Sequence, residues 1–466
     1  MKKYRFTMGT LFFLGTCFQS LHAQTAPTLQ EILDSALTHD YSYENKQLSL
    51  KSIELDRERL NDVYMPRVEL NAKEAYLFAA ANLTTPEFAF TQLPIPLPLV
   101  IPEHENRYQI DNFMTQADLK ATFVLFAGGK VGYLKKANEA RLEAETALVN
   151  TDKNGIVQNV SAVYDQLSML KAVKAMLDES QKRLDENTKT ARKALENGLI
   201  TQYEYNKVNL AQAQLKSKYK EYEGKRRLVL LNLNMLTKIP MERLEKIDED
   251  LQVMTIAYVD APQNRPELTA LNAAVRANEY KVKAAKTWWI PKLGASASVS
   301  YLGLQNPRIR TTQPTLITQE KINYTFNNFN AAPIFTAGVG LKWDLFDGRE
   351  GITETKKAQL DLQIAKNKLE DANEKIQLQL EKNKVELEVA SEQLNVRQIA
   401  LQIAENSMDQ AMKEFKIGLI KSTQLLEAEN DLQQAKLDFS QAVFQQRRAA
   451  VNYLEAAGIL NSTTLK

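Results

Sequence analysis

The sequence of 466 residues has one cysteine and three histidines. The cysteine, Cys17, lies in the first 23 residues, so the rest of the chain cannot form disulfides or a thiolate metal site. His39 and His104 are far apart in the sequence, which excludes a histidine-rich metal site and a Ser-His-Asp triad. Gly-Gly-Lys at 128–130 lacks the spacing of a phosphate-binding loop. We therefore expect no catalytic activity, no metal and no cofactor.

A strong net charge is also absent. The chain carries a formal charge of +2, and without its first 23 residues 56 basic side chains face 57 acidic ones. Such a balanced chain has no strong field with which to attract nucleic acid, so no nucleic-acid partner is expected.

No run of 18 apolar residues follows the first 23, so no transmembrane helix is predicted. Residues 1–23 are typical of a signal peptide, with a basic start, an apolar run at 6–18 and a small-residue cleavage site ending at Ala23. A second interpretation is a lipoprotein box at 14–17 that would lipidate Cys17, for which Thr16 is a poor residue. Both interpretations predict export.

Four short segments alternate apolar and polar residues with the period of a β-strand that has one apolar face. The clearest runs from Phe335 to Gly348, where Phe, Ala, Val, Leu, Trp and Leu alternate with mostly polar residues or glycine. About 10 such residues suffice for a tilted strand to cross a bilayer. A half-exposed strand of a soluble sandwich would show the same pattern. The other three segments are 66–72, 116–125 and 291–301.

The chain also contains an internal duplication. Leu-Phe-Ala-Gly-Gly at 125–129 recurs as Leu-Phe-Asp-Gly-Arg at 345–349, and Gly-Leu-Ile at 198–200 recurs at 418–420, each time 220 residues later. We predict a first structural repeat over 24–240, an equatorial linker over 241–262 and a second repeat over 263–466.

Proline-free stretches at 130–197 and 349–417 carry apolar residues in steps of three and four, the spacing of coiled coils. A shorter helix at 201–236 is expected to return along the first. Earlier helices are predicted over 29–61 and 264–289. The segments 79–115, which is rich in proline, and 302–333 are predicted to be long loops.

Four strands cannot close a membrane-spanning sheet, because known closures need about 8 strands or more. Oligomerisation is therefore required if the strands span a membrane. Two copies would supply eight strands and three would supply twelve, and the sequence does not choose between them.

The combination of these features resembles the TolC-type outer-membrane factor family. The resemblance rests on the duplicated halves, Pro66 and Pro291 at strand starts, the joints at Phe126 and Phe346, and the two Gly-Leu-Ile turns. It implies a mixed α and β membrane protein: a trimer whose 12-stranded β-barrel, with four strands from each chain, continues into a long α-helical coiled-coil barrel. It also implies an outer-membrane exit duct with a large periplasmic extension in a Gram-negative bacterium. The partners would be two further copies, outer-membrane lipid, a periplasmic adaptor (membrane fusion) protein and an inner-membrane transporter of the RND or ABC type.

The resemblance further assigns residues to two sites. The two turns correspond to the hairpin tips on which the adaptor docks, although glycine turns of this kind also close any tight helical hairpin. In the family, acidic side chains six and nine residues after the second turn glycine narrow the periplasmic entrance; these positions hold Gln424 and Glu427, and Glu204 is the sixth residue after the first turn glycine. Glu427 and Glu429 could equally be ordinary solvated charges. The predicted tip residues are Gly198, Leu199, Ile200, Thr201, Gly418, Leu419, Ile420 and Ser422.

Two other functions fit the same sequence. One is a structural or adhesive stalk anchored in the outer membrane, and the other is a soluble periplasmic coiled coil. Ion conductance would separate a duct from a stalk, and extraction without detergent would identify a soluble protein.

Overall fold

The computed structural model describes residues 25–90, 99–262, 264–315, 319–461 and 464–465. The predicted signal peptide, with Cys17, lies outside these residues. The chain divides into two compact units, one made from the described parts of Met1–Leu50, Glu143–Asn272 and Lys368–Lys466, the other from Lys51–Leu142 and Ala273–Asn367. The structure is thus a mixed α and β fold, as expected.

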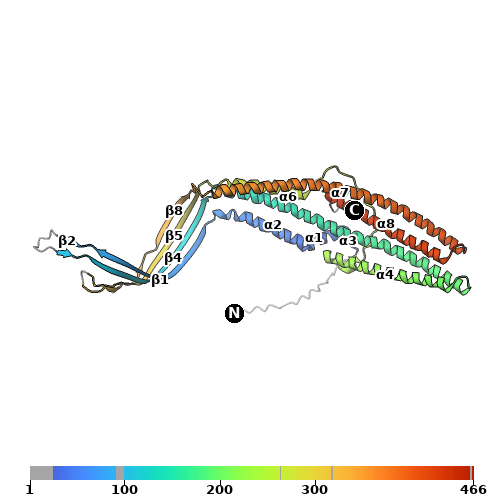
Figure 1. The fold of residues 1–466 in the computed structure, drawn as a ribbon, viewed down its shortest axis with the longest axis horizontal. Coiled ribbons are helices and arrows are strands. Elements are labelled where there is room, and N and C mark those ends of the chain that lie inside the picture. The colour runs from blue at the N-terminus through green and yellow to red at the C-terminus, as the bar shows by residue number, and fades with distance from the viewer. Residues whose placement is uncertain (1–24, 91–98, 263, 316–318, 462–463, 466) are drawn as a thin grey trace, which may run out of the picture. The chain divides into compact units, whose positions relative to one another are not determined.

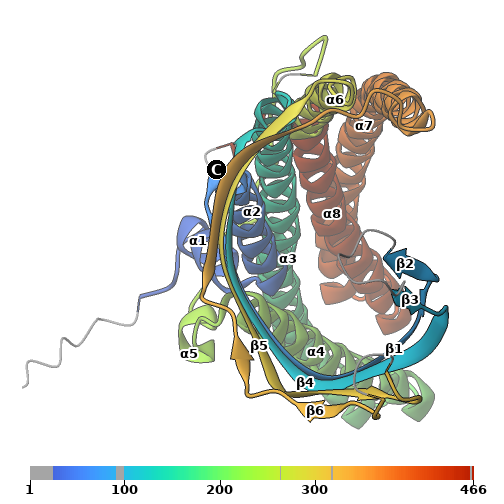
Figure 2. The same ribbon diagram turned by 90° about the vertical axis from the view of Figure 1, so that its left-hand side faces the viewer.

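The second unit contains an antiparallel sheet whose long strands are β1 (Arg67–Thr85), β4 (His104–Phe126), β5 (Lys292–Thr311) and β8 (Ile334–Lys342). They pair in the order β1-β4-β5-β8, and β6 (Asn323–Thr325) and β7 (Phe329–Asn330) extend the pairing along β5. β2 (Phe88–Phe90) and β3 (Leu99–Ile101) form a separate pair. Figure 2 shows β1, β4 and β5 bending together in one arc.

The register of this sheet aligns the predicted apolar positions across all four strands. Leu70, Leu119, Val299 and Phe335 lie in one row, and all four are exposed. The neighbouring row on the opposite face is polar and consists of Glu69, Lys120, Ser298 and Thr336, with a hydrogen bond of 2.7 Å between the last two. The alternation read from single segments is therefore a property of the whole sheet.

The strands are longer than the sequence patterns predicted. The expected loop over 79–115 was wrong for most of its length, because β1 continues to Thr85 and β4 begins at His104. β5 likewise extends to Thr311, and its proline at 307 lies where the pairing to β4 shifts register between Asp111 and Phe113. A proline is tolerated at such an irregularity because no ladder hydrogen bond is required of it there.

The predicted end of the last strand at Gly348 was also wrong. β8 ends at Lys342, and the indole Nε1 of Trp343 donates a 3.0 Å hydrogen bond to the carbonyl of Trp289.

Two long helices, α3 (Lys130–Glu196) and α7 (Glu350–Lys416), have 67 residues each and match the predicted coiled-coil stretches. At 1.5 Å per residue each is about 100 Å long. α4 (Gln202–Thr237) returns along α3, and α8 (Ser422–Ala456) returns along α7 (Figure 1). α6 (Pro266–Ala285) ends earlier than predicted.

The first predicted helix is divided into α1 (Leu29–His39) and α2 (Tyr41–Arg59), with a short 3-10 turn at Asp62–Tyr64. The division falls at Asp40, whose backbone is extended and whose carboxylate accepts a 2.8 Å hydrogen bond from the backbone N–H of Tyr43. An aspartate that caps a following turn in this way starts a new helix.

The core of the first unit lies where α1, α3, α4 and α8 meet, and it includes the fully buried Ile32, Val160, Leu233 and Tyr453. The segment after α4 contains one short helix, α5 (Met241–Leu244), and then irregular chain. That chain is held by side chains of α8: the amide of Gln446 exchanges hydrogen bonds with the backbone of Met254 at 3.1 and 2.7 Å. None of the helices in the described ranges contains a stretch long and apolar enough to span a membrane.

Candidate hairpin tips and entrance residues

The first hairpin turn connects α3 to α4 around Gly198. This glycine has a φ of 72°, a left-handed conformation that favours glycine. The N–H of Leu199 donates to the carbonyl of Ala194 at 2.8 Å, and the N–H of Gly198 donates to Leu195 at 3.0 Å. These bonds satisfy the last carbonyls of α3, so the turn is a Schellman-type helix end.

A capping box then starts α4. The hydroxyl of Thr201 accepts a 3.2 Å hydrogen bond from the N–H of Glu204, and the Glu204 carboxylate accepts a 3.1 Å bond from the N–H of Thr201. This arrangement satisfies two backbone donors that the helix leaves unpaired. One predicted entrance residue, Glu204, is therefore also a structural part of the tip.

The second turn, between α7 and α8, repeats the backbone geometry with a different cap. Gly418 has a φ of 77°, and the N–H of Leu419 donates to Glu414 at 3.0 Å. The cap position holds Lys421, whose side chain has no acceptor, so only the return bond remains, from its N–H to the Gln424 side chain at 3.1 Å. This turn thus lacks half of the box.

The apolar residues of the tips divide into two pairs. Leu199 and Leu419 are 76% and 71% exposed at the ends of the hairpins. Ile200 and Ile420 instead pack against the hydrophobic clusters between the helices. The leucines are thus the residues that a partner could contact, and the isoleucines hold the turns to the hairpins.

The remaining predicted residues occupy different environments. Ser422 is 2% exposed, and its hydroxyl has no hydrogen-bond partner in the part of the chain that the structure describes. Glu427 is exposed on α8, and within the described ranges its carboxylate makes no ion pair. The structure therefore brings Glu204 to Thr201 and Gln424 to Lys421, and leaves Glu427 free.

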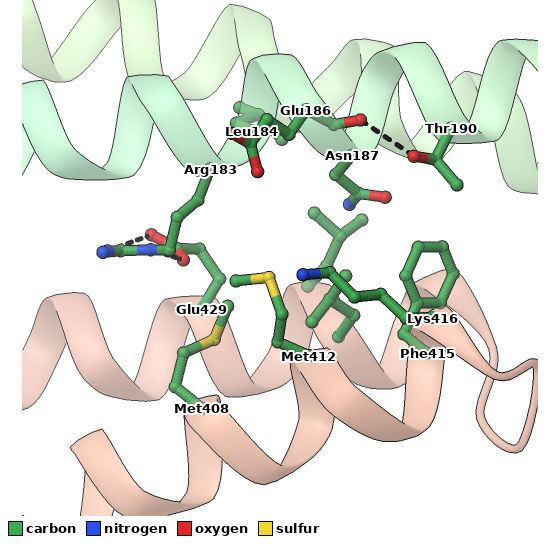
Figure 3. A pocket seen from close by; sticks show the side chains of 12 residues that line it. Arg183, Leu184, Glu186, Asn187, Thr190, Met408, Met412, Phe415, Lys416 and Glu429 are labelled. Atoms are coloured by element: carbon green, nitrogen blue, oxygen red, sulfur yellow. Dashed lines mark hydrogen bonds and ion pairs between the residues drawn. The ribbon is translucent and has the colours of Figure 1, made fainter.

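Glu429 is not an ordinary solvated charge, so that interpretation was wrong for this residue. It is 6% exposed and forms a bidentate ion pair with Arg183 of α3, with Nε–Oε2 and Nη2–Oε1 distances of 2.6 and 3.0 Å (Figure 3). Gln433 donates to the same carboxylate at 3.1 Å and accepts from Lys218 of α4 at 2.7 Å. These bonds connect α8 to both helices of the first hairpin.

The electrostatics of this pair follow from its burial. Burial lowers the pKa of Arg183, but the hydrogen bond and attraction to Glu429 outweigh that effect and raise the pKa above its ordinary value. The sequence held one signal of this pair: Glu429 lies between Leu425 and Leu432 in steps of four and three, a core-facing position of a coiled coil. Its partner, 246 residues away, could not be identified from spacing.

No three histidine, cysteine, aspartate or glutamate side chains gather closely enough to hold a metal ion anywhere in the described ranges. The arrangement at the tips is one of turns, exposed leucines and ion pairs. It is suited to protein contact.

Comparison with known proteins identifies the family. Residues 257–458 match the sequence model described as outer membrane efflux protein. The chain belongs to the outer membrane efflux protein family. The curated outer membrane efflux protein BepC of Brucella suis biovar 1 (strain 1330) is 21% identical over 356 residues, which cover 73% of this chain and 72% of BepC.

Solved structures of outer-membrane channels share the fold of this outer membrane efflux protein. The outer-membrane channel OprN matches with a TM-score of 0.67 and 15% identity, covering 93% of this chain and 90% of OprN. The outer membrane protein VceC of Vibrio cholerae matches with a TM-score of 0.65 and 18% identity, covering 92% and 96%. The predicted family is thus confirmed, as is the outer-membrane location with a periplasmic extension.

Proposed function

We propose that this outer membrane efflux protein is the exit duct of a tripartite efflux or type I secretion system. It would conduct substrates passively from a periplasmic adaptor and an inner-membrane transporter of the RND or ABC type to the exterior. The transporter, and not the duct, would supply the driving force. The observation that carries this proposal is a sheet left incomplete by one chain.

Both outer edges of that sheet are open. Among the described strands, β1 pairs only with β4, and β8 pairs only with β5 and not with a further strand. An unpaired strand edge cannot remain in lipid, because each free N–H and C=O costs several kcal/mol there. We infer that β8 of one copy pairs with β1 of the next, and that three copies close a 12-stranded barrel whose exposed apolar row faces lipid.

The helices support the same assembly. α7 carries an apolar stripe that no part of the described chain covers, and its members recur in coiled-coil steps of three, four and seven. A neighbouring copy would cover this stripe and continue the helices into a coiled-coil barrel. The stripe consists of Leu378, Val385, Val389, Val396, Ile399 and Ile403.

The tips and entrance complete the proposal. The exposed Leu199 and Leu419, with their turns, would contact the adaptor, and Glu427 would lie near the threefold axis with Glu204 and Gln424 closer to the tips. Gln424 carries no charge, so we expect weaker cation attraction at this entrance than two acidic rings would give. The equal lengths of α3 and α7 support the interpretation of the two halves as repeats.

Conductance in planar bilayers tests the duct directly. Purified protein should insert as a species with the mass of three chains and pass a steady ion current. A stalk would insert without current, and a soluble coiled coil would leave washed membranes without detergent; either result would overturn the proposal. Co-purification of an adaptor and an inner-membrane transporter tests the partners.

A further inference from the structure

A small cavity lies in the first unit between α3 and the helices α7 and α8, close to the two turns. Its volume is about 80 Å³ and it is open to solvent on one side. Most of its wall is apolar and polarizable: Met408, Met412, Phe415 and Leu425 line it, and Figure 3 shows both methionines reaching into the space between the helices.

One polar group of this cavity is unpaired. Asn187 of α3 is 7% exposed, and its side-chain oxygen Oδ1 has no hydrogen-bond partner among the described residues. Figure 3 shows its amide pointing from α3 toward the side chains of α7. A buried acceptor without a donor is destabilising and rare, so a donor from outside the chain would be favoured at this position.

The charges around the cavity select an uncharged occupant. Arg183 and Glu429 neutralise each other through their two hydrogen bonds, and Glu186 and Lys416, on the rim, have opposite signs. No net charge is therefore left for an ion to satisfy. Thioether sulfur and an aromatic ring instead make favourable contacts with an aromatic ligand.

The size of the cavity agrees with one ring. A water molecule needs roughly 10–15 Å³ of such volume, and an apolar cavity of about 150 Å³ holds benzene. A volume of about 80 Å³ that opens to solvent on one side accommodates a single ring whose far edge extends outward. A hydroxyl on that ring can donate to Oδ1 or accept from Nδ2, so it fits either orientation of the asparagine amide.

We propose that this cavity is a binding site for a small neutral aromatic alcohol. The hydroxyl hydrogen-bonds the amide of Asn187, and the ring packs against Met412 and Phe415. A molecule bound there contacts α3, α7 and α8 together, so it stabilises the packing of one hairpin against the other. The site is independent of the duct function proposed above.

Fluorine NMR of 4-fluorophenol with the full-length protein in detergent tests the proposal, with the same detergent without protein as the reference. We expect protein-dependent line broadening that unlabelled phenol reverses, and about tenfold weaker binding of fluorobenzene, which lacks the donor. Asn187→Leu should weaken 4-fluorophenol binding about tenfold and leave fluorobenzene binding unchanged.

Two further variants separate this site from general partitioning. Met412→Trp should fill the cavity and abolish binding of both probes, whereas Asn154→Leu, elsewhere on α3, should change neither. Equal binding of the two probes to the wild type, full binding to Asn187→Leu or to Met412→Trp, or a cavity filled by a neighbouring copy in an experimental structure of the assembly would each overturn the proposal.

Discussion

At the scale of single residues, the tips depend on two glycines with left-handed backbone. A Cβ at Gly198 or Gly418 would meet no atom within 4 Å, so the demand for glycine is conformational and not steric. Any effect of a substitution there reports on the turn itself.

Replacing both glycines by valine should therefore distort both turns, at about 1–2 kcal/mol each, because a β-branched residue is strained in this conformation. We expect loss of adaptor co-purification with normal insertion into the outer membrane. The matched control replaces both by asparagine, which tolerates the left-handed region, and should retain most of the association. Unchanged adaptor binding by the valine variant would contradict the docking assignment.

The buried ion pair makes a second prediction at this scale. Arg183→Leu leaves the Glu429 carboxylate buried without its partner, so the free energy of unfolding should fall by roughly 2–3 kcal/mol. Arg183→Leu with Glu429→Leu should recover much of the loss, since no uncompensated charge remains. Thermal unfolding followed by circular dichroism measures both.

The control is an exposed pair on α7, Lys413 with Asp409, at 2.6 Å. Lys413→Ala should change the free energy of unfolding by less than about 1 kcal/mol, because water and salt screen such pairs. An effect as large as that of Arg183→Leu would show that burial is not what makes the Arg183 pair important.

At the scale of elements, the two hairpins have the same turn but unequal caps. α4 begins with the reciprocal bonds of Thr201 and Glu204, whereas α8 begins at Lys421 with only the bond from Gln424. The start of α8 is thus predicted to open more readily than the start of α4.

Lys421→Thr should complete the second capping box, because Gln424 already occupies the position three residues later. The gain should be about 0.5–1 kcal/mol, and Thr201→Ala should lose about 1 kcal/mol in the first hairpin. Hydrogen exchange of the first-turn amides of α4 and α8 measures both changes. Faster exchange in α8 after Lys421→Thr would refute the argument.

At the scale of the whole molecule, the sheet has one face suited to lipid and one suited to water. The pair Phe335 and Thr336 samples these two faces at neighbouring positions of the same strand. Their substitution distinguishes a membrane-spanning sheet from a soluble one.

Phe335→Arg should destabilise the membrane-inserted protein by about 2–4 kcal/mol if the residue lies near the midplane, because a charge on the lipid face must be desolvated. Thr336→Arg, on the opposite face, should be tolerated. The measurement is the amount of protein recovered as an assembled species from detergent-extracted outer membranes. Equal recovery of the two variants would argue against lipid contact on the Phe335 face.

The sequence by itself determined the periodic features of this protein. Heptad spacing located both 67-residue helices almost to the residue, and period-two alternation identified four strands and the face on which Leu70 and Phe335 lie. These features are local, because the direction of each side chain follows from the backbone geometry of its own element.

Only the tertiary structure decided the rest. The full length of β1 and β4 depends on pairing between strands whose alternation has lapsed, and the break at Asp40 competes with a helical pattern that continues on both sides. The Arg183–Glu429 pair and the unpaired amide of Asn187 arise between helices far apart in the chain. Neither has a spacing that a sequence can display, because only packing brings those side chains together and removes them from water.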